Sequence, residues 1–116
     1  MTQGILREVN LEQGHPTADK AIRRLTFEIH NSRDLHASVL KIIHGYGSSG
    51  SGGRIRVEAR RYLERLRLKG EIRDFITGEE FSIFHAPTRD AFLRCGALRN
   101  DTDLERHNNG VTFIVL

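Results

Sequence analysis

Four stretches of the chain carry the hydrophobic pattern of β-strands. Residues Leu6–Leu11 alternate apolar and polar side chains imperfectly, which favours a short strand over a helix. Residues Val39–Ile43 form a mostly apolar, β-branched run, which is typical of a central strand covered on both faces. Residues Val111–Leu116 form a similar run and predict a last strand inside the sheet. A further strand is predicted over Ile72–Ile76.

Between these strands, apolar side chains recur at helical spacing. Thr17 is a suitable cap for a helix that extends to about Ser32. A second helix is predicted from Arg54 until Gly70 stops it, and a third from Pro87 to about Leu98. The intervening residues, Glu79–Phe84, are expected to form a bend or a short strand.

The order of these elements predicts an α/β fold. Strands and helices alternate along the chain, which implies right-handed βαβ crossovers in a small, mixed, four-stranded sheet with about three helices packed on it. The length of 116 residues suits one domain over residues 1–116.

Composition excludes several classes of protein. The hydrophobic fraction of 38% and charged fraction of 28% are those of a globular chain, and no apolar stretch is long enough to span a bilayer. The first nine residues lack the pattern of a secretory signal, so a cytoplasmic location is expected. The single cysteine, Cys95, excludes an internal disulfide and a cysteine-rich zinc site, and we expect it to be a core residue.

The positive charge is concentrated in the second predicted helix. The formal net charge of the whole chain is only +3. Between Arg54 and Lys69, however, seven basic residues face two acids, a local charge of +5, so the rest of the chain is slightly acidic. Because charged runs are usually solvated helix faces, this cluster gains meaning only from its position.

That position is directly behind a glycine-rich turn. Residues Gly45–Gly53 hold five glycines and three serines. A strand that enters such a turn and continues into a helix places backbone N–H groups and the positive end of the helix dipole at one spot. This arrangement suits a phosphate-bearing partner. The alternative is a flexible surface loop, against which the following basic helix argues.

Two known phosphate motifs do not fit this turn. Residues Gly45–Gly50 match the dinucleotide pattern G-x-G-x-x-G literally, but the predicted helix begins only after Gly53 and the chain has no second mononucleotide-binding half. The nucleoside-triphosphate loop requires a lysine after its last glycine, and Gly50 is followed by Ser51. We therefore expect no nucleotide cofactor.

The segment Ile42–Gly47, with His44, Gly45 and Gly47, resembles the His-Gly-x-Gly signature of the Smr (small MutS-related) domain. The resemblance extends over Leu6–Leu116, and Asn108–Thr112 partly matches the glycine-rich motif before the family's last strand. It implies a two-layer α/β sandwich, similar to the C-terminal domain of a translation initiation factor. It also implies binding of DNA or structured RNA, and nicking endonuclease activity in some members.

The binding residues proposed at this stage belong to the glycine turn, the start of the basic helix and the last turn of the chain. They are Gly45, Tyr46, Gly47, Ser48, Gly50, Gly52, Gly53, Arg54, Arg56, Asn108 and Asn109. Tyr46 is expected to be exposed and able to stack on a base. A protein-interaction or adaptor domain remains the alternative, and the oligomeric state is left open.

The first strand departs from the family pattern. The family carries Leu-Asp-Leu-His-Gly, whereas this chain has Asn10 in place of the aspartate and Glu12 in place of the histidine. Cleavage is therefore expected to be weak or absent. The candidate catalytic residues are His44, Glu12 and His15, with Mg²⁺ or Mn²⁺ as cofactor if the protein cleaves. His44 has three alternative roles: a general base, a hydrogen-bond donor to phosphate, or a hydrogen-bond partner of the loop backbone.

Overall fold

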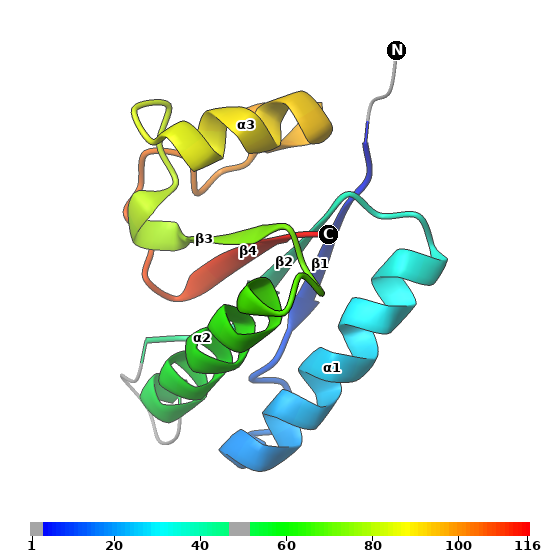
Figure 1. Ribbon diagram of the computed structural model, residues 1–116. Helices are drawn as coiled ribbons and strands as arrows, with labels where there is room; N and C mark the ends of the chain where they lie inside the picture. Colours follow the sequence, from blue (N-terminus) through cyan, green and yellow to red (C-terminus); the bar gives the residue numbers. More distant parts are fainter. Residues whose placement is uncertain (1–3, 47–51) are drawn as a thin grey trace.

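The computed structural model describes residues 4–46 and 52–116 (Figure 1). These residues form four strands, three α-helices and two short 3₁₀ segments. The elements are β1 (Leu6–Asn10), α1 (Ala18–Asp34), β2 (Val39–Ile43), α2 (Gly52–Leu68), β3 (Asp74–Thr77), η1 (Gly78–Glu80), α3 (Ala86–Arg94), η2 (Gly96–Asn100) and β4 (Val111–Val115).

The strands form one mixed sheet in the order β1-β2-β4-β3. β1 is parallel to β2, and β4 is antiparallel to both β2 and β3. The last strand therefore lies inside the sheet, as predicted from its apolar sequence. This topology brings the ends of β1, β2 and β3 to one edge of the sheet together with the start of β4.

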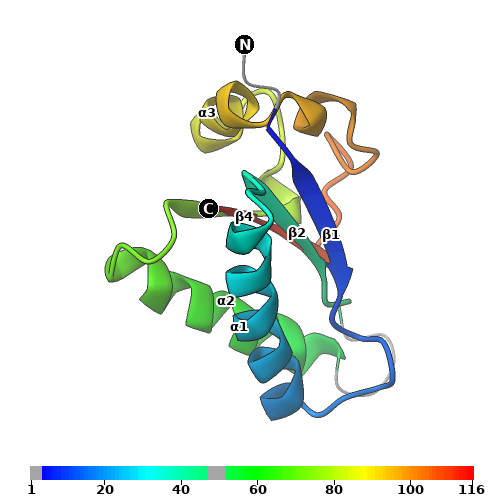
Figure 2. The ribbon, with the colours of Figure 1, turned by 90° about the vertical axis from the view of Figure 1, so that its right-hand side faces the viewer.

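Both faces of the sheet are covered (Figures 1 and 2). Helices α1 and α2 pack on one face and complete the expected two-layer sandwich, with Leu25, Leu40 and Leu63 fully buried between the layers. The segment that contains η1, α3 and η2 covers the other face, where Phe81 packs on Phe113 with ring centroids 4.1 Å apart. Because both faces of the sheet are covered, the central strands β2 and β4 are buried.

The predicted helix and strand bounds need three corrections. α2 begins at Gly52, so Arg56 stands in its second turn and not in its first. α3 ends at Arg94, because Cys95 is extended and a 3₁₀ segment follows from Gly96. The third strand covers Asp74–Thr77, two residues later at its start than predicted. The bend expected over Glu79–Phe84 is present: its first two residues belong to η1, and residues 82–84 form a bend and a turn. The predicted cap of α1 is confirmed by the hydrogen bond from the Lys20 amide to the Thr17 hydroxyl.

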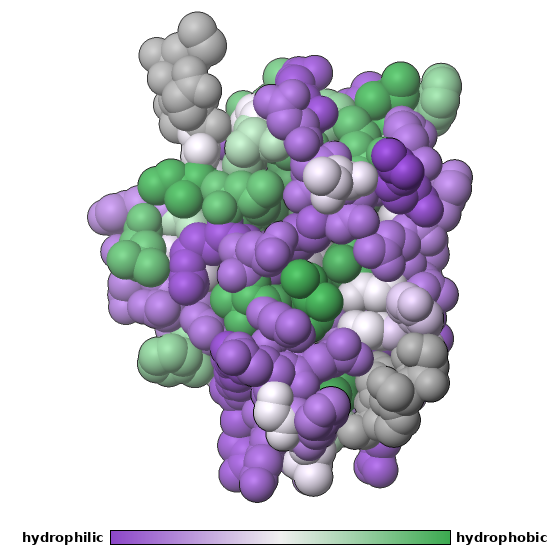
Figure 3. Space-filling view, turned by 180° about the vertical axis from the view of Figure 1, so that it is seen from behind, coloured by the Kyte–Doolittle hydropathy of each residue, from purple (hydrophilic) through white to green (hydrophobic). Residues whose placement is uncertain are grey.

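The surface seen in Figure 3 is largely hydrophilic, and its hydrophobic areas are separated by hydrophilic ones. Among the described residues, no helix combines the length and the apolar character that crossing a membrane requires.

Candidate functional site

Those candidate residues from the sequence that the structure describes gather at one edge of the sheet. We call this edge the glycine edge and define it by residues 11–15, 44–46, 52–56 and 107–110. The parallel pairing of Asn10 with Ile43 and the antiparallel pairing of Ile43 with Val111 bring residues 11–15, 44–46 and 107–110 together, and the charge of Arg56 acts on His44. β1 is parallel and β4 antiparallel to β2, so the end of β1 and the start of β4 both lie beside the end of β2.

Gly45 lies at the centre of the glycine edge in a conformation that favours glycine. Its φ is +73°, and a Cβ atom built there would lie 1.8 Å from Oε1 of Glu12. The Glu12 carboxylate therefore rests directly against the Gly45 backbone. The Gly45 N–H donates to the Gly110 carbonyl over 3.0 Å, as does the N–H of His44. Both amides are consequently engaged within the protein.

His44 is fully buried beneath this turn, with both ring nitrogens in hydrogen bonds. Nδ1 lies 2.8 Å from the Gly45 carbonyl oxygen, which only accepts, so Nδ1 carries the proton. Nε2 lies 2.8 Å from the Thr112 hydroxyl, which donates to it. The Thr112 oxygen in turn accepts from Nε of Arg60 over 3.2 Å. A directed chain thus runs from Arg60 to the Gly45 carbonyl.

The surroundings of His44 keep the ring neutral. Burial is the largest cause and lowers the pKa of His44 from 6.5 to about 4. The hydrogen bond to the Gly45 carbonyl opposes this shift, while the charges of Arg60 and Arg56 reinforce it. At neutral pH the imidazole therefore acts as one donor and one acceptor, as the hydrogen bonds require.

Arg60 of α2 contacts both β4 and η1, the short segment that follows β3. Its guanidinium binds both carboxylate oxygens of Glu79, at 2.8 and 2.7 Å, and reaches the Val111 carbonyl at 3.3 Å. Burial opposes the charge on Glu79, but the hydrogen bonds from Arg60, a backbone hydrogen bond and the charges of Arg60 and Arg56 together outweigh it and lower the pKa of that carboxyl. Arg60 is therefore occupied by the protein itself and holds the end of β3 against α2.

Arg54 and Arg56 lack the ion pairs that Arg60, Arg61 and Arg67 of α2 form. Neither of the two forms an ion pair with any of the residues that the structure describes, whereas Arg61 pairs with Glu58 and Arg67 pairs with Glu64. Within the same residues Arg65 lacks one too, but its guanidinium lies over the ring of Tyr62. Arg54 is exposed at the start of α2, and Arg56 is half-buried. The charge of Arg56 acts on both His44 and Glu79, which places it close to the glycine edge.

The remaining candidate residues differ in their exposure, and some of them lie outside the described residues. Tyr46 is 56% exposed, as expected, and its ring lies beside Gly110. His15 is exposed in the turn after β1, where its amide donates to the Glu12 carbonyl. Asn108 and Asn109 are half-buried just before β4. Gly47, Ser48 and Gly50 lie outside the described residues, and Gly52 and Gly53 open α2.

Sequence reasoning missed three residues of the site: Arg60, Glu79 and Thr112. Arg60 follows Arg56 by four positions, which puts both on one side of a helix, so a signal for it existed. Glu79 and Thr112 are separated from Arg60 by 19 and 52 residues, and no local pattern indicated their contact.

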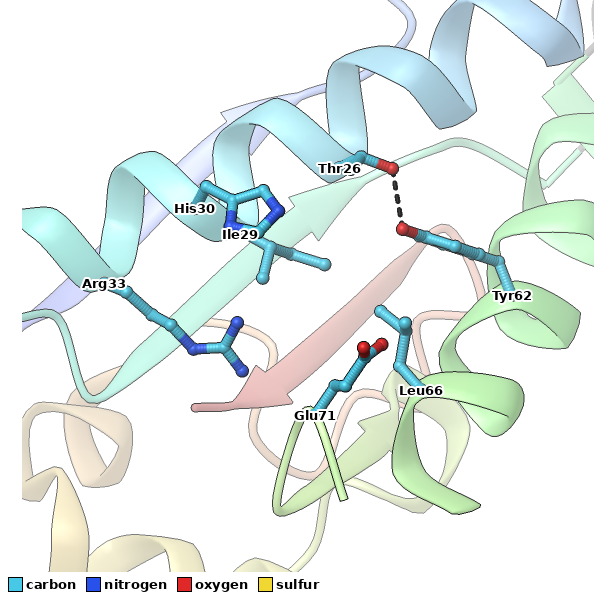
Figure 4. A pocket seen from close by; sticks show the side chains of 7 residues that line it. All are labelled: Thr26, Ile29, His30, Arg33, Tyr62, Leu66 and Glu71. Carbon is cyan, nitrogen blue, oxygen red and sulfur yellow. Dashed lines mark hydrogen bonds between the residues drawn. The ribbon is translucent and has the colours of Figure 1, made fainter. Parts of the chain in front are cut away.

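Within residues 4–46 and 52–116, no group of three histidine, cysteine or acidic side chains is arranged to hold a metal ion. A separate cavity of about 180 Å³ lies between α1 and α2, where the Tyr62 hydroxyl contacts Thr26 over 2.7 Å (Figure 4). Arg33 and Glu71 line its other end, at the side of the helices remote from the glycine edge.

Comparison with solved structures supports the resemblance seen in the sequence. The fold is similar to the crystal structure of the Smr domain of MutS2 from Thermus thermophilus, with a TM-score of 0.59 and 20% sequence identity. The match covers 95% of this chain and 96% of that domain, so the whole chain has the Smr-type fold. No family model matches the sequence, and no curated protein matches it.

Proposed function

We propose that this protein binds nucleic acid by contacting phosphates at the glycine edge. The observation that carries the proposal is the position of Arg54 and Arg56: two cations without an ion-pair partner among the described residues stand beside a glycine turn at the start of α2. A cation in the first turn of a helix, as Arg54 is, is unfavourable by itself, and an anion bound there would offset that cost. The Smr-type fold is consistent with this function.

The buried histidine contributes to the proposal by orienting the turn. Because His44 holds the Gly45 carbonyl toward the interior, the N–H of the next residue, Tyr46, points to the opposite side of the same planar peptide group. That N–H is the backbone donor we assign to phosphate. The exposed Tyr46 ring beside it would stack on an unpaired base.

The first test is binding as a function of salt concentration. For Arg54→Ala combined with Arg56→Ala, we expect at least a tenfold loss of affinity for a DNA duplex or an RNA hairpin at low salt. The slope of log K against log salt should fall by about 1.8, since each phosphate contact on duplex DNA contributes roughly 0.9. Fluorescence anisotropy with labelled oligonucleotides of random sequence measures both quantities.

The chain offers a matched control for this pair. Arg61→Ala with Arg67→Ala removes the same charge from the same helix, but both arginines are already paired with glutamates. This control should retain most of the affinity and the wild-type slope. If wild type does not bind at low salt, or if both pairs of substitutions weaken binding equally, the proposed site is wrong.

We also propose that the protein cleaves its ligand poorly or not at all. Phosphodiester cleavage needs a positioned base or a metal-bound hydroxide. Asn10 stands where the family has aspartate, and His44 is buried with both nitrogens engaged. Glu12 is the remaining carboxylate at this position, and it lies against Gly45.

Nicking of supercoiled plasmid is accordingly expected to stay at the background level in Mg²⁺ or Mn²⁺, equal to that in chelator. Gel electrophoresis of the relaxed and supercoiled forms measures the rate. Robust nicking by wild type that is lost in both His44→Ala and Glu12→Gln would contradict this expectation and make those two residues catalytic.

A further inference from the structure

A buried lysine on the opposite face of the sheet is connected to the glycine edge. Lys41 of β2 is 4% exposed, and its Nζ lies 3.0 Å from the Asp101 carboxylate and 2.7 Å from that of Asp103. Burial opposes the charge on Lys41, but the hydrogen bonds with Asp103 and Asp101 outweigh it and raise the pKa of the ammonium group. Lys41 is thus a charged anchor inside the segment that covers this face.

From Asp103, hydrogen bonds continue to the backbone of the glycine turn. The Asn108 side-chain N–H donates to Asp103 Oδ1 over 2.9 Å, and Asn108 Oδ1 accepts the Gly110 N–H over 2.9 Å. The Gly110 carbonyl then accepts the N–H groups of His44 and Gly45, both at 3.0 Å. Each link has a fixed donor and a fixed acceptor.

The direction of this chain matters because the Asn108 amide can turn over. Its nitrogen must face Asp103 for its oxygen to face Gly110, and the position of Asp103 depends on Lys41. The second chain, from Arg60 through Thr112 to His44, reaches the carbonyl of the same turn from the other face of the sheet. The two chains together hold the N–H and the carbonyl of Gly45.

We propose that Lys41 is a positioning residue for the glycine edge. Through Asp103 and Asn108 it holds the Gly110 carbonyl against the amides of His44 and Gly45, and so keeps the backbone of residues 44–46 in the conformation that binds phosphate. The effect on binding rests on the proposed function, whereas the effect on the two amides does not.

Asp103→Ala and Asp101→Asn form a matched pair for the test. Each removes one carboxylate from Lys41, but only Asp103 contacts Asn108. Asp101→Asn also keeps an oxygen for the Asp103 amide, which Asp101 Oδ1 accepts at 2.8 Å. A general loss of stability should therefore appear in both variants, and a loss of positioning only in the first.

Hydrogen exchange followed by NMR gives the specific readout. In Asp103→Ala, the His44 and Gly45 amides should exchange about tenfold faster relative to the amides in the middle of β2, since local opening and not global unfolding would expose them. In Asp101→Asn this ratio should stay at the wild-type value. Lys41→Met should behave like Asp103→Ala. If Lys41→Met does not fold, the comparison of Asp103→Ala with Asp101→Asn tests the inference.

Affinity for the same oligonucleotides gives the second readout. Asp103→Ala should bind several-fold more weakly than Asp101→Asn, although both lose one negative charge and electrostatics alone would make them equal. Equal exchange ratios in the matched pair would overturn the inference. If wild type binds no oligonucleotide, the proposed function fails, and the exchange ratios still decide the role of Lys41.

Discussion

Lowering the pH from 7 to 5 is expected to reduce the free energy of unfolding by about 2 kcal/mol through His44 alone, from its pKa of about 4 in the folded protein and 6.5 in the unfolded chain. The unfolded chain binds the proton more readily, so acid favours unfolding. The contribution of His44 is complete above pH 6.5 and is lost as the pH falls toward about 4. Urea denaturation at several pH values measures it.

The chosen window separates His44 from the carboxylates. The pKa values of Glu79 and Asp103 are lowered from 4.5 and 3.8, so the stability that these groups contribute is lost only at more acidic pH. His44→Gln should be less stable at pH 7 but should lose most of the pH dependence between 7 and 5. His30→Gln, at an exposed position, should keep the wild-type dependence. An unchanged slope in His44→Gln would refute the assignment.

Most of the sheet and two of the helices follow from local patterns in the sequence. The apolar runs at Val39–Ile43 and Val111–Leu116 predict buried strands, and both strands are buried because helices or loops cover each face of the sheet. The stripe after Thr17 predicts α1, because one face of a helix packs on that sheet. These predictions succeed since a single segment carries all the information they require.

The bounds that were wrong depend on interactions that no segment shows by itself. Gly96 follows Cys95, whose extended backbone ends α3, although the apolar spacing of Cys95 and Leu98 suggests that the helix continues. Both side chains are fully buried even so, because the 3₁₀ segment turns Leu98 back to the core. Apolar spacing thus predicted which residues are buried, but not the backbone that buries them.

Several residues of the candidate site could be predicted from the sequence, but the hydrogen bonds between them could not. The pairing of β1 and β4 with β2 brings Glu12, His44 and Asn108, all candidates from the sequence, to one edge. The hydrogen bonds at that edge join residues far apart in sequence, such as His44 with Thr112 and Arg60 with Glu79. Which donor meets which acceptor is decided by packing between elements, so no motif indicates it.

Lys41 is a second example of a residue whose contacts the sequence does not indicate. The apolar run around Lys41 predicts a strand covered on both faces, but it does not indicate what the lysine contacts. The segment between β3 and β4 brings Asp101 and Asp103 over the buried Lys41. A buried charge whose two nearest carboxylates are 60 and 62 residues away in the sequence is recognisable only after the fold is known.

Replacing Gly78 by alanine is expected to destabilise the protein by about 3 kcal/mol or more, at or beyond the upper end of the usual cost of overpacking. A Cβ atom at Gly78 would lie 1.8 Å from the backbone oxygen of Asn108 and 2.8 Å from a methyl group of Val111. Backbone cannot rotate away as the end of a side chain can, so the turn before β4 must shift. Thermal and urea unfolding measure the loss of stability.

The same shift should also weaken binding at the glycine edge, because the Asn108 side chain holds the Gly110 amide. Gly70→Ala is the matched control. Gly70 has a φ of +75° with no atom within 4 Å of a built Cβ, so this substitution imposes backbone strain alone, about 1 kcal/mol. Gly78→Ala should cost clearly more than Gly70→Ala and should alone reduce oligonucleotide affinity. Equal costs for the two variants would show that Gly78 and Asn108 are not in close contact in solution.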